Sequence, residues 1–168
     1  YIVNTAVKML GFINRNTREF RSLECIKLLY KTLVRSRLEY ASVIWSPYYN
    51  VHINAIERVQ KKHLKHLYFV MSGTYPYRNV SYDSLLDQFN MPSLNSRRTY
   101  NLLVFLYKLI HSIIDSPVLL SNVNFQVPSY GVRSFTSISF ETPNTNQHLH
   151  SPLLNMFRYY HSVQNNVD

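Results

Sequence analysis

The sequence predicts a mainly α-helical protein, and three observations lead to that fold class. From Leu23 to Trp45 the chain contains neither glycine nor proline, the two residues that most strongly interrupt helices. Within this stretch, apolar residues recur at the i, i+3, i+4 and i+7 positions typical of amphipathic helices. Hydrophobic residues make up 46% of the chain and aromatic residues 14%, which favours a packed core over a disordered chain.

The first half predicts three helices. Residues 2–13 form a short first helix, and Ser22 is expected to cap a second one that runs without glycine or proline from Leu23 to Trp45. Pro47 ends that helix because the residue before a proline disfavours helical backbone. A third amphipathic helix runs from about Val51 to Tyr68. The short connection predicts that the second and third helices pack antiparallel.

The second half predicts helices with a short extended region. Ser81 is expected to cap a helix that ends at Phe89. The helix from Arg98 to Ile114 is apolar almost all round, so we expect it at the centre of a bundle, joining both parts of the chain in one core. Residues 115–151 are rich in Ser, Asn, Thr and Pro, with alternation that predicts one or two short strands, at Val123, Phe125 and Val127 and at Phe135, Ile138 and Phe140. Ser151 and Pro152 predict the start of a last helix.

The helical spacing also predicts a core. Its expected members lie on the second, third and central helices: Leu33, Tyr40, Trp45, Ile56, Val59, Leu103, Phe105 and Leu106. Tyr40 and Trp45 are interpreted as aromatic anchors between the second and third helices. Tyr48 and Tyr49 follow Pro47, where we expect more exposure, and a stacking role on a base or sugar stays open for one of them.

Positive charge is concentrated at the front of the chain. The net charge is +9, and residues 1–65 hold twelve Lys and Arg against four acids, whereas the other 103 residues hold six against five. Such asymmetry indicates a polyanionic partner for the front half, with a solubilising face as the alternative.

The cations form two rows at helical spacing. Lys27, Lys31 and Arg35 are four residues apart on the second helix. The third helix carries a second row at i, i+3, i+4 and i+7, namely Arg58, Lys61, Lys62 and Lys65. Residues at these spacings share one helix face. The hypothesis is that the two helices bury their apolar sides together and turn both rows toward one common track of phosphates.

No catalytic or metal-binding pattern is found in the sequence. Two-metal chemistry needs clustered carboxylates, but no two of the nine acids are adjacent. Cys25 is the only cysteine, which excludes an internal disulfide, and no histidine has the companions of a zinc site. We therefore expect neither a metal nor a cofactor here, and no enzyme, unless folding gathers a carboxylate cluster.

The compartment is inferred from what the sequence lacks. The longest apolar run, Leu102 to Tyr107, is far shorter than the roughly 20 residues of a membrane span, and no secretory leader is visible. We expect an intracellular piece of a longer protein, nuclear or cytoplasmic, with no membrane partner. The oligomeric state is left open.

Long strings of this sequence resemble a known family. The segment LVRSRLEYASVIWSPYYNVHINAIERVQKKHLKHLYF resembles the C-terminal part of the reverse transcriptase of jockey-like non-LTR retrotransposons. The resemblance extends to MLGFINRN before this segment and to LDQFNMPSLNSRRTYNLLVFLYKLIHSIID, NVNFQVPSYGVRS and HSPLLNMFRYYH after it. It therefore covers nearly the whole chain.

The resemblance implies a role inside a polymerase. Residues 1–72 correspond to a basic helical thumb, which packs on the template–primer, and residues 73–168 to a C-terminal extension docked on it as one unit. The catalytic aspartates and their Mg²⁺ lie in the palm, outside this chain. The implied partners are an RNA–DNA or RNA template–primer and the palm. The alternative is a structural or protein-interaction module, or a degenerate remnant without activity.

Overall fold

The computed structural model describes residues 1–20, 22–77, 80–126, 138–139 and 143–164. The chain is mainly helical, as predicted, and forms two compact units. Unit 1 comprises residues 1–42 and 47–98, and unit 2 comprises residues 43–46 and 99–168. The boundary expected after residue 72 therefore falls inside unit 1.

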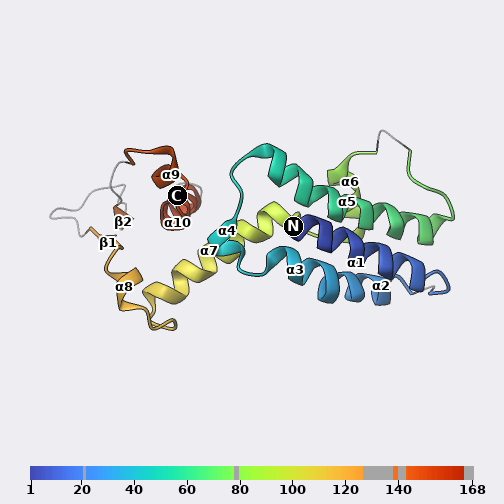
Figure 1. Cartoon of the computed structure of the whole chain (residues 1–168), viewed down its shortest axis with the longest axis horizontal. Helices are drawn as coiled ribbons and strands as arrows, with labels where there is room; N and C mark the ends of the chain where they lie inside the picture. Colours follow the sequence, from blue (N-terminus) through green and yellow to red (C-terminus); the bar gives the residue numbers. More distant parts are fainter. Residues whose placement is uncertain (21, 78–79, 127–137, 140–142, 165–168) are drawn as a thin grey trace. The chain divides into compact units, whose positions relative to one another are not determined.

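Unit 1 is a bundle in which α1 contacts both the α2–α3 segment and α5. Figure 1 shows the α2–α3 segment running antiparallel to α5, as predicted. The elements of this unit are α1 (Ile2–Asn16), α2 (Leu23–Leu29), the π-helix η1 (Tyr30–Arg35), α3 (Ser36–Glu39), α5 (Asn50–Ser72), α6 (Tyr82–Phe89) and the first residues of α7 (Leu94–Ile110). The predicted caps are present, because the Ser22 hydroxyl accepts the Cys25 N–H and the Ser81 hydroxyl accepts the Asp83 N–H.

The helix predicted from Leu23 to Trp45 is interrupted twice. Its middle is the π-helix η1, where the Thr32 hydroxyl lies within hydrogen-bond distance of two carbonyl oxygens of the preceding turn, 2.9 Å from that of Leu28. A hydroxyl that competes for helix carbonyls favours such a local widening. The helix then ends at Glu39, because Ala41 adopts a left-handed backbone with φ 51° before α4 (Ser42–Trp45) begins.

These interruptions change which residues form the core. Ile26, Tyr30, Val34 and Leu38 are four residues apart and all fully buried. In a regular α-helix this spacing drifts by about 40° per step, and the wider turns of η1 offset the drift. Leu33 is instead 36% exposed, so its assignment to the core was wrong.

One of the two predicted aromatic anchors lies outside the core. Tyr40 stands at the helix end just before Ala41 and is 81% exposed, so its assignment to the core was wrong. Trp45 is half-buried and is grouped with unit 2, and its role as an anchor between the two helices stays a prediction. Ile56 and Val59 are buried on α5, which confirms their predicted place in the core.

Unit 2 has its own apolar core. It is formed by residues of α7 and α10 (Pro152–Gln164) together with two residues of the extended region: Leu102, Leu106, Leu109, Val123, Ile138, Leu154, Met156 and Phe157. Leu106 is buried as predicted, whereas Leu103 and Phe105 are half-buried. Tyr100 and Tyr107 are exposed. The expectation that this helix is enclosed on all sides was therefore wrong.

The extended region of unit 2 contains a short antiparallel pair. The strands β1 (Asn124–Phe125) and β2 (Ile138–Ser139) pair Asn124 with Ser139 and Phe125 with Ile138, which confirms short strands at these two places. Val127, Phe135 and Phe140, which were predicted with them, lie outside the described residues. The helices α8 (Pro117–Leu120) and α9 (Asn146–Leu149) flank the pair along the chain, and α10 begins at Pro152 as predicted.

Within the described chain, no helix combines the length and the apolar character that crossing a bilayer requires.

Candidate nucleic-acid interface

The first predicted cation row is largely occupied by internal contacts. Lys27 pairs with Glu24 at 2.9 Å, its side chain is only 15% exposed, and its ammonium lies 5.8 Å from the centre of the Phe89 ring. Arg35 lies 3.7 Å from Glu39 and is 17% exposed. Lys31 is exposed. The predicted row of three cations facing solvent was therefore wrong, because two of its members lie against unit 1 beside carboxylates.

Glu39 joins the α2–α3 segment to the start of α7. Its two carboxylate oxygens accept two N–H groups of the Arg97 guanidinium, and the Nη2–Oε2 distance is 2.9 Å. Such a two-point contact is the strongest geometry for an arginine–carboxylate pair. Burial and the nearby Arg97 charge lower the pKa of Arg35, and Glu39 opposes that shift. Arg35 is thus one member of a charge cluster inside unit 1.

The second predicted row lies on the outer face of α5. The buried residues of α5 include Ile56, Val59 and His63, and at about 100° per residue the four basic residues fall on the opposite side. Arg58 and Lys62 are exposed, and Lys61 and Lys65 are half-exposed. Among the described residues, none of these four cations has a carboxylate oxygen within 4 Å. This face is the candidate interface, and we call it the α5 basic face.

The one acid of α5 points away from this face. The Glu57 carboxylate accepts the backbone N–H groups of Leu94 at 3.3 Å and Asn95 at 2.6 Å, at the N-terminus of α7. It also accepts the Tyr82 hydroxyl at 2.6 Å and lies 3.8 Å from the Arg98 guanidinium. A carboxylate at this position satisfies N–H groups that the helix leaves unpaired and complements its dipole. Glu57 is therefore unavailable to Lys61, its neighbour one turn along.

A buried polar group lies on the inner face of α5. The Tyr30 hydroxyl donates to Gln60 at 3.1 Å, and the Gln60 amide donates to the Pro92 carbonyl at 2.8 Å. The Tyr30 ring stacks on His63 with 3.9 Å between ring centres. Burial lowers the pKa of His63 to about 3 and raises the pKa of Tyr30 well above its usual value. Both groups are neutral at pH 7 and serve the core.

The predicted tyrosines lie at the loop before α5. Tyr48 and Tyr49 are 44% and 60% exposed, as expected after Pro47, and their ring centres are 4.1 Å apart. The Tyr49 ring also approaches His52 on the first turn of α5 at 6.3 Å. The two rings therefore contact each other beside the start of α5, and a stacking role on nucleic acid stays a prediction.

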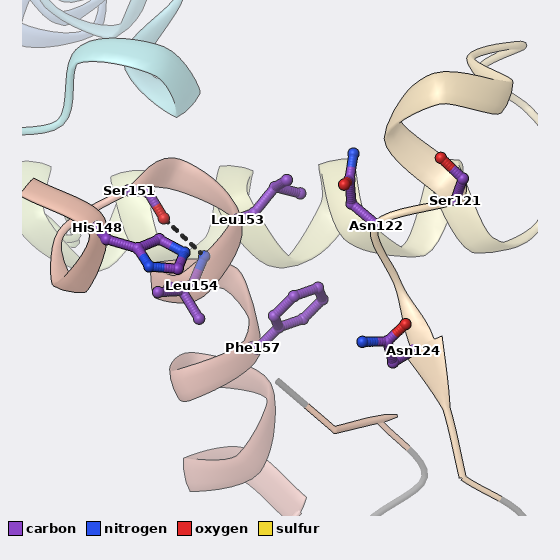
Figure 2. A pocket seen from close by; sticks show the side chains of 8 residues that line it. All are labelled: Ser121, Asn122, Asn124, His148, Ser151, Leu153, Leu154 and Phe157. Carbon is purple, nitrogen blue, oxygen red and sulfur yellow. Dashed lines mark hydrogen bonds between the residues drawn. The ribbon is translucent and has the colours of Figure 1, made fainter. Parts of the chain in front are cut away.

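Unit 2 contains a cavity of about 430 Å³ between its extended region and α10. Figure 2 shows polar side chains around its rim and Leu153, Leu154 and Phe157 on α10. Much of the polar rim is already bonded, since Ser151 accepts the Leu154 N–H and the Asn122 amide donates to the Val118 carbonyl. Its described lining holds one histidine, His148, and no carboxylate, so it offers no acid–base pair.

The sequence reasoning missed the residues that join α5 to α7. The sequence shows Glu57 as one of the four acids of residues 1–65 and Arg98 as the start of a helix, but it does not show that both side chains lie in the polar interior of unit 1. The partners of Glu57 lie 25 to 41 positions away in the chain, so no local spacing indicates them. Within the described residues, no cluster of three or more His, Cys, Asp or Glu side chains has the arrangement of a metal site.

Comparison with known proteins adds no assignment to this geometry. The chain matches no family model, no curated protein and no solved structure.

Proposed function

We propose that unit 1 binds the phosphate backbone of an RNA–DNA or RNA duplex through the α5 basic face, as the thumb-like part of a non-LTR retrotransposon reverse transcriptase. One observation carries the proposal. Four cations lie on the outer side of α5, and none has a carboxylate partner among the described residues. The resemblance of the sequence to that family supplies the parent enzyme and the kind of duplex.

The dimensions of the α5 basic face suit a polyanion. From Arg58 to Lys65 the helix rises by about 10 Å, which is the rise of about three nucleotides along one strand. Each neutralised phosphate releases condensed counterions, so the binding constant should fall steeply as salt increases. A line of positive charge with this length is sufficient for a weak contact that depends on salt.

The chemistry of the face suits a contact that ignores sequence. Lysine ammonium groups act as point charges on phosphates and carry no information about the bases. A polymerase thumb must hold any template, so backbone contact is the appropriate mode. The resemblance places the catalytic aspartates and Mg²⁺ in the palm, and this chain is expected to bind without polymerising.

A titration with salt tests the proposal. The affinity of the full chain for a fluorescently labelled RNA–DNA duplex would be measured by anisotropy between 50 and 300 mM salt. This range brackets physiological ionic strength, at which the Debye length is about 8 Å. The variant K61Q/K62Q/K65Q should bind at least about tenfold more weakly at low salt, with a slope of log K against log salt shallower by about 2 to 3. The loss should be similar for duplexes of different sequence.

A variant with the same loss of charge serves as the control. Lys8, Arg15 and Arg18 are three exposed cations of unit 1 that lie outside α5, and K8Q/R15Q/R18Q should retain most of the wild-type affinity. An equal loss in both variants would show that net charge alone governs binding. Absence of salt-dependent binding in the wild type would reject the proposal and favour the structural or protein-interaction alternative.

A further inference from the structure

Two aromatic rings stack on each other at the C-terminal end of α5. The ring centres of Phe69 and Tyr75 are 4.6 Å apart, and the planes are inclined by 18°. Phe69 is 37% exposed and Tyr75 is 65% exposed. A stacked pair of large rings with this much surface in solvent is unusual for side chains that serve only to fill a core.

A specific turn holds the two rings together. Gly73 adopts a left-handed backbone with φ 75°, and its N–H donates to the Phe69 carbonyl at 2.8 Å, which ends α5. The Ser72 hydroxyl lies 2.8 Å from the Tyr68 carbonyl oxygen and 2.9 Å from that of Thr74. This arrangement is a glycine C-cap that reverses the chain, so that Tyr75 folds back onto the last turn of α5.

The stacked pair continues the α5 basic face. Phe69 follows Lys65 by four positions, which places it about 40° around the helix and about 6 Å further along it. It therefore shares the outer side of α5 with Arg58, Lys62 and Lys65. The row of cations on α5 is followed by this pair of exposed rings. Ser72 and Thr74, in the turn that connects Phe69 to Tyr75, have polar side chains.

We propose that the Phe69–Tyr75 pair is a stacking platform for an unpaired base of single-stranded nucleic acid that extends beyond the duplex held on the α5 basic face. The inference rests on the proposed function. Every base has a flat aromatic surface, so stacking on protein rings contributes affinity without selecting a sequence. Cations that track the backbone, followed by rings that receive bases, are the two components of sites for single strands.

Charge complementarity favours nucleic acid over an apolar peptide as the occupant. The surface beside the rings is cationic, and among the described residues its four cations have no carboxylate within 4 Å. An apolar peptide would gain nothing from these charges, whereas a nucleic acid strand supplies both the phosphates and the bases. The pair is also preassembled, which reduces the conformational entropy lost on binding.

The experiment compares three forms of one duplex: blunt, with a four-nucleotide single-stranded extension, and with the same extension lacking its bases. Binding of the full chain would be measured by anisotropy at one low salt concentration. The wild type should bind the extension with bases about tenfold more tightly than the abasic extension. The abasic form isolates stacking, because it keeps the phosphates and removes the aromatic surfaces.

Two double variants separate stacking from a structural role. F69L/Y75L keeps an apolar contact at the helix end but removes both rings, so it should lose the tenfold preference while keeping its melting temperature and its affinity for the blunt duplex. F69Y/Y75F keeps two rings and should retain the preference. A preference that survives in F69L/Y75L, or is lost in F69Y/Y75F, would overturn the platform.

The outcomes also separate this inference from the proposed function. Equal binding of the base-bearing and abasic extensions by the wild type would overturn the platform and leave duplex binding standing. Conversely, the wild type and F69Y/Y75F could both prefer the base-bearing extension over the abasic one and yet not bind the blunt duplex. That result would support the platform and reject the proposed function.

Discussion

The α2–α3 segment and α5 each carry basic residues at helical spacing, yet the two sets have different surroundings in unit 1. On the α2–α3 segment, Lys27 and Arg35 have Glu24 and Glu39 within one helical turn, and Glu39 also binds Arg97. On α5, the only acid is drawn inward to the start of α7. Two of the three cations on the α2–α3 segment are thus paired internally, whereas among the described residues none of the four on α5 has a carboxylate within 4 Å.

The difference shows that the positions of nearby acids determine whether a row of cations is available to a polyanion. A line of lysines and arginines at i and i+4 indicates a shared face, but whether that face is available to a polyanion depends on where the nearby carboxylates point. Glu57 illustrates this, because its usual partner at i+4 would be Lys61, while the fold directs it to the backbone of α7.

The largest effect is expected when Glu57 is removed. Glu57→Ala leaves two N–H groups of α7 and the Tyr82 hydroxyl without their acceptor, and removes the carboxylate that lies 3.8 Å from the Arg98 guanidinium. We expect a loss of about 3 kcal/mol in the free energy of unfolding, in the range for breaking a buried charged contact. Urea denaturation followed by circular dichroism measures it.

Glu24→Ala is the matched control for this prediction. Glu24 is also paired with a basic residue, but its side chain is 79% exposed. Exposed pairs contribute little, so the control should change the unfolding free energy by at most about 0.5 kcal/mol. Similar losses in both variants would show that Glu57 is an ordinary surface acid.

The second prediction concerns acid sensitivity on the inner face of α5. The pKa of His63 is lowered from 6.5 to about 3 by burial and by the nearby His66 and Lys27 charges, with Tyr30 stacked on the ring. Because the unfolded chain binds the proton more readily, stability is fully present above pH 6.5 and is lost as the pH falls from 6.5 toward 3. By pH 4.5 the loss should reach about 3 kcal/mol.

His63→Phe isolates this contribution. Neither ring nitrogen of His63 has a hydrogen-bond partner among the described residues, so phenylalanine keeps the stacked ring without removing a bond. The unfolding free energy of the variant should rise relative to that of the wild type by about 3 kcal/mol from pH 7 to pH 4.5, because only the wild type loses stability through His63. A difference that does not change with pH would mean that His63 is protonated as easily in the folded protein as in the unfolded one.

Prediction from the sequence succeeded where local spacing decides and failed where distant partners do. The caps at Ser22 and Ser81 and the helix α5 follow from short-range patterns, and the structure contains them. The break at Ala41 does not, since alanine is the best helix former. Without knowledge of that break, Tyr40 was counted among the core residues, and it is exposed.

The candidate interface shows the same limit. The spacing of Arg58, Lys61, Lys62 and Lys65 indicated one shared face, and the structure places all four on the outer side of α5. The inward turn of Glu57 depends on Asn95, 38 residues away, and no periodicity reveals it. The turn that brings Tyr75 onto Phe69 depends likewise on the left-handed backbone of Gly73.

The smallest expected effect compares one lysine from each helix. Lys27→Gln and Lys62→Gln remove the same charge, but Lys27 is paired and 15% exposed whereas Lys62 is exposed, with no carboxylate within 4 Å among the described residues. For binding to the RNA–DNA duplex, Lys62→Gln should make the slope of log K against log salt shallower by about 0.7 to 0.9, and Lys27→Gln should leave it unchanged. Equal changes in the two slopes would mean that Lys27 contacts phosphate as Lys62 does, despite its pairing with Glu24. The proposed difference between a paired row on the α2–α3 segment and an unpaired row on α5 would then be wrong.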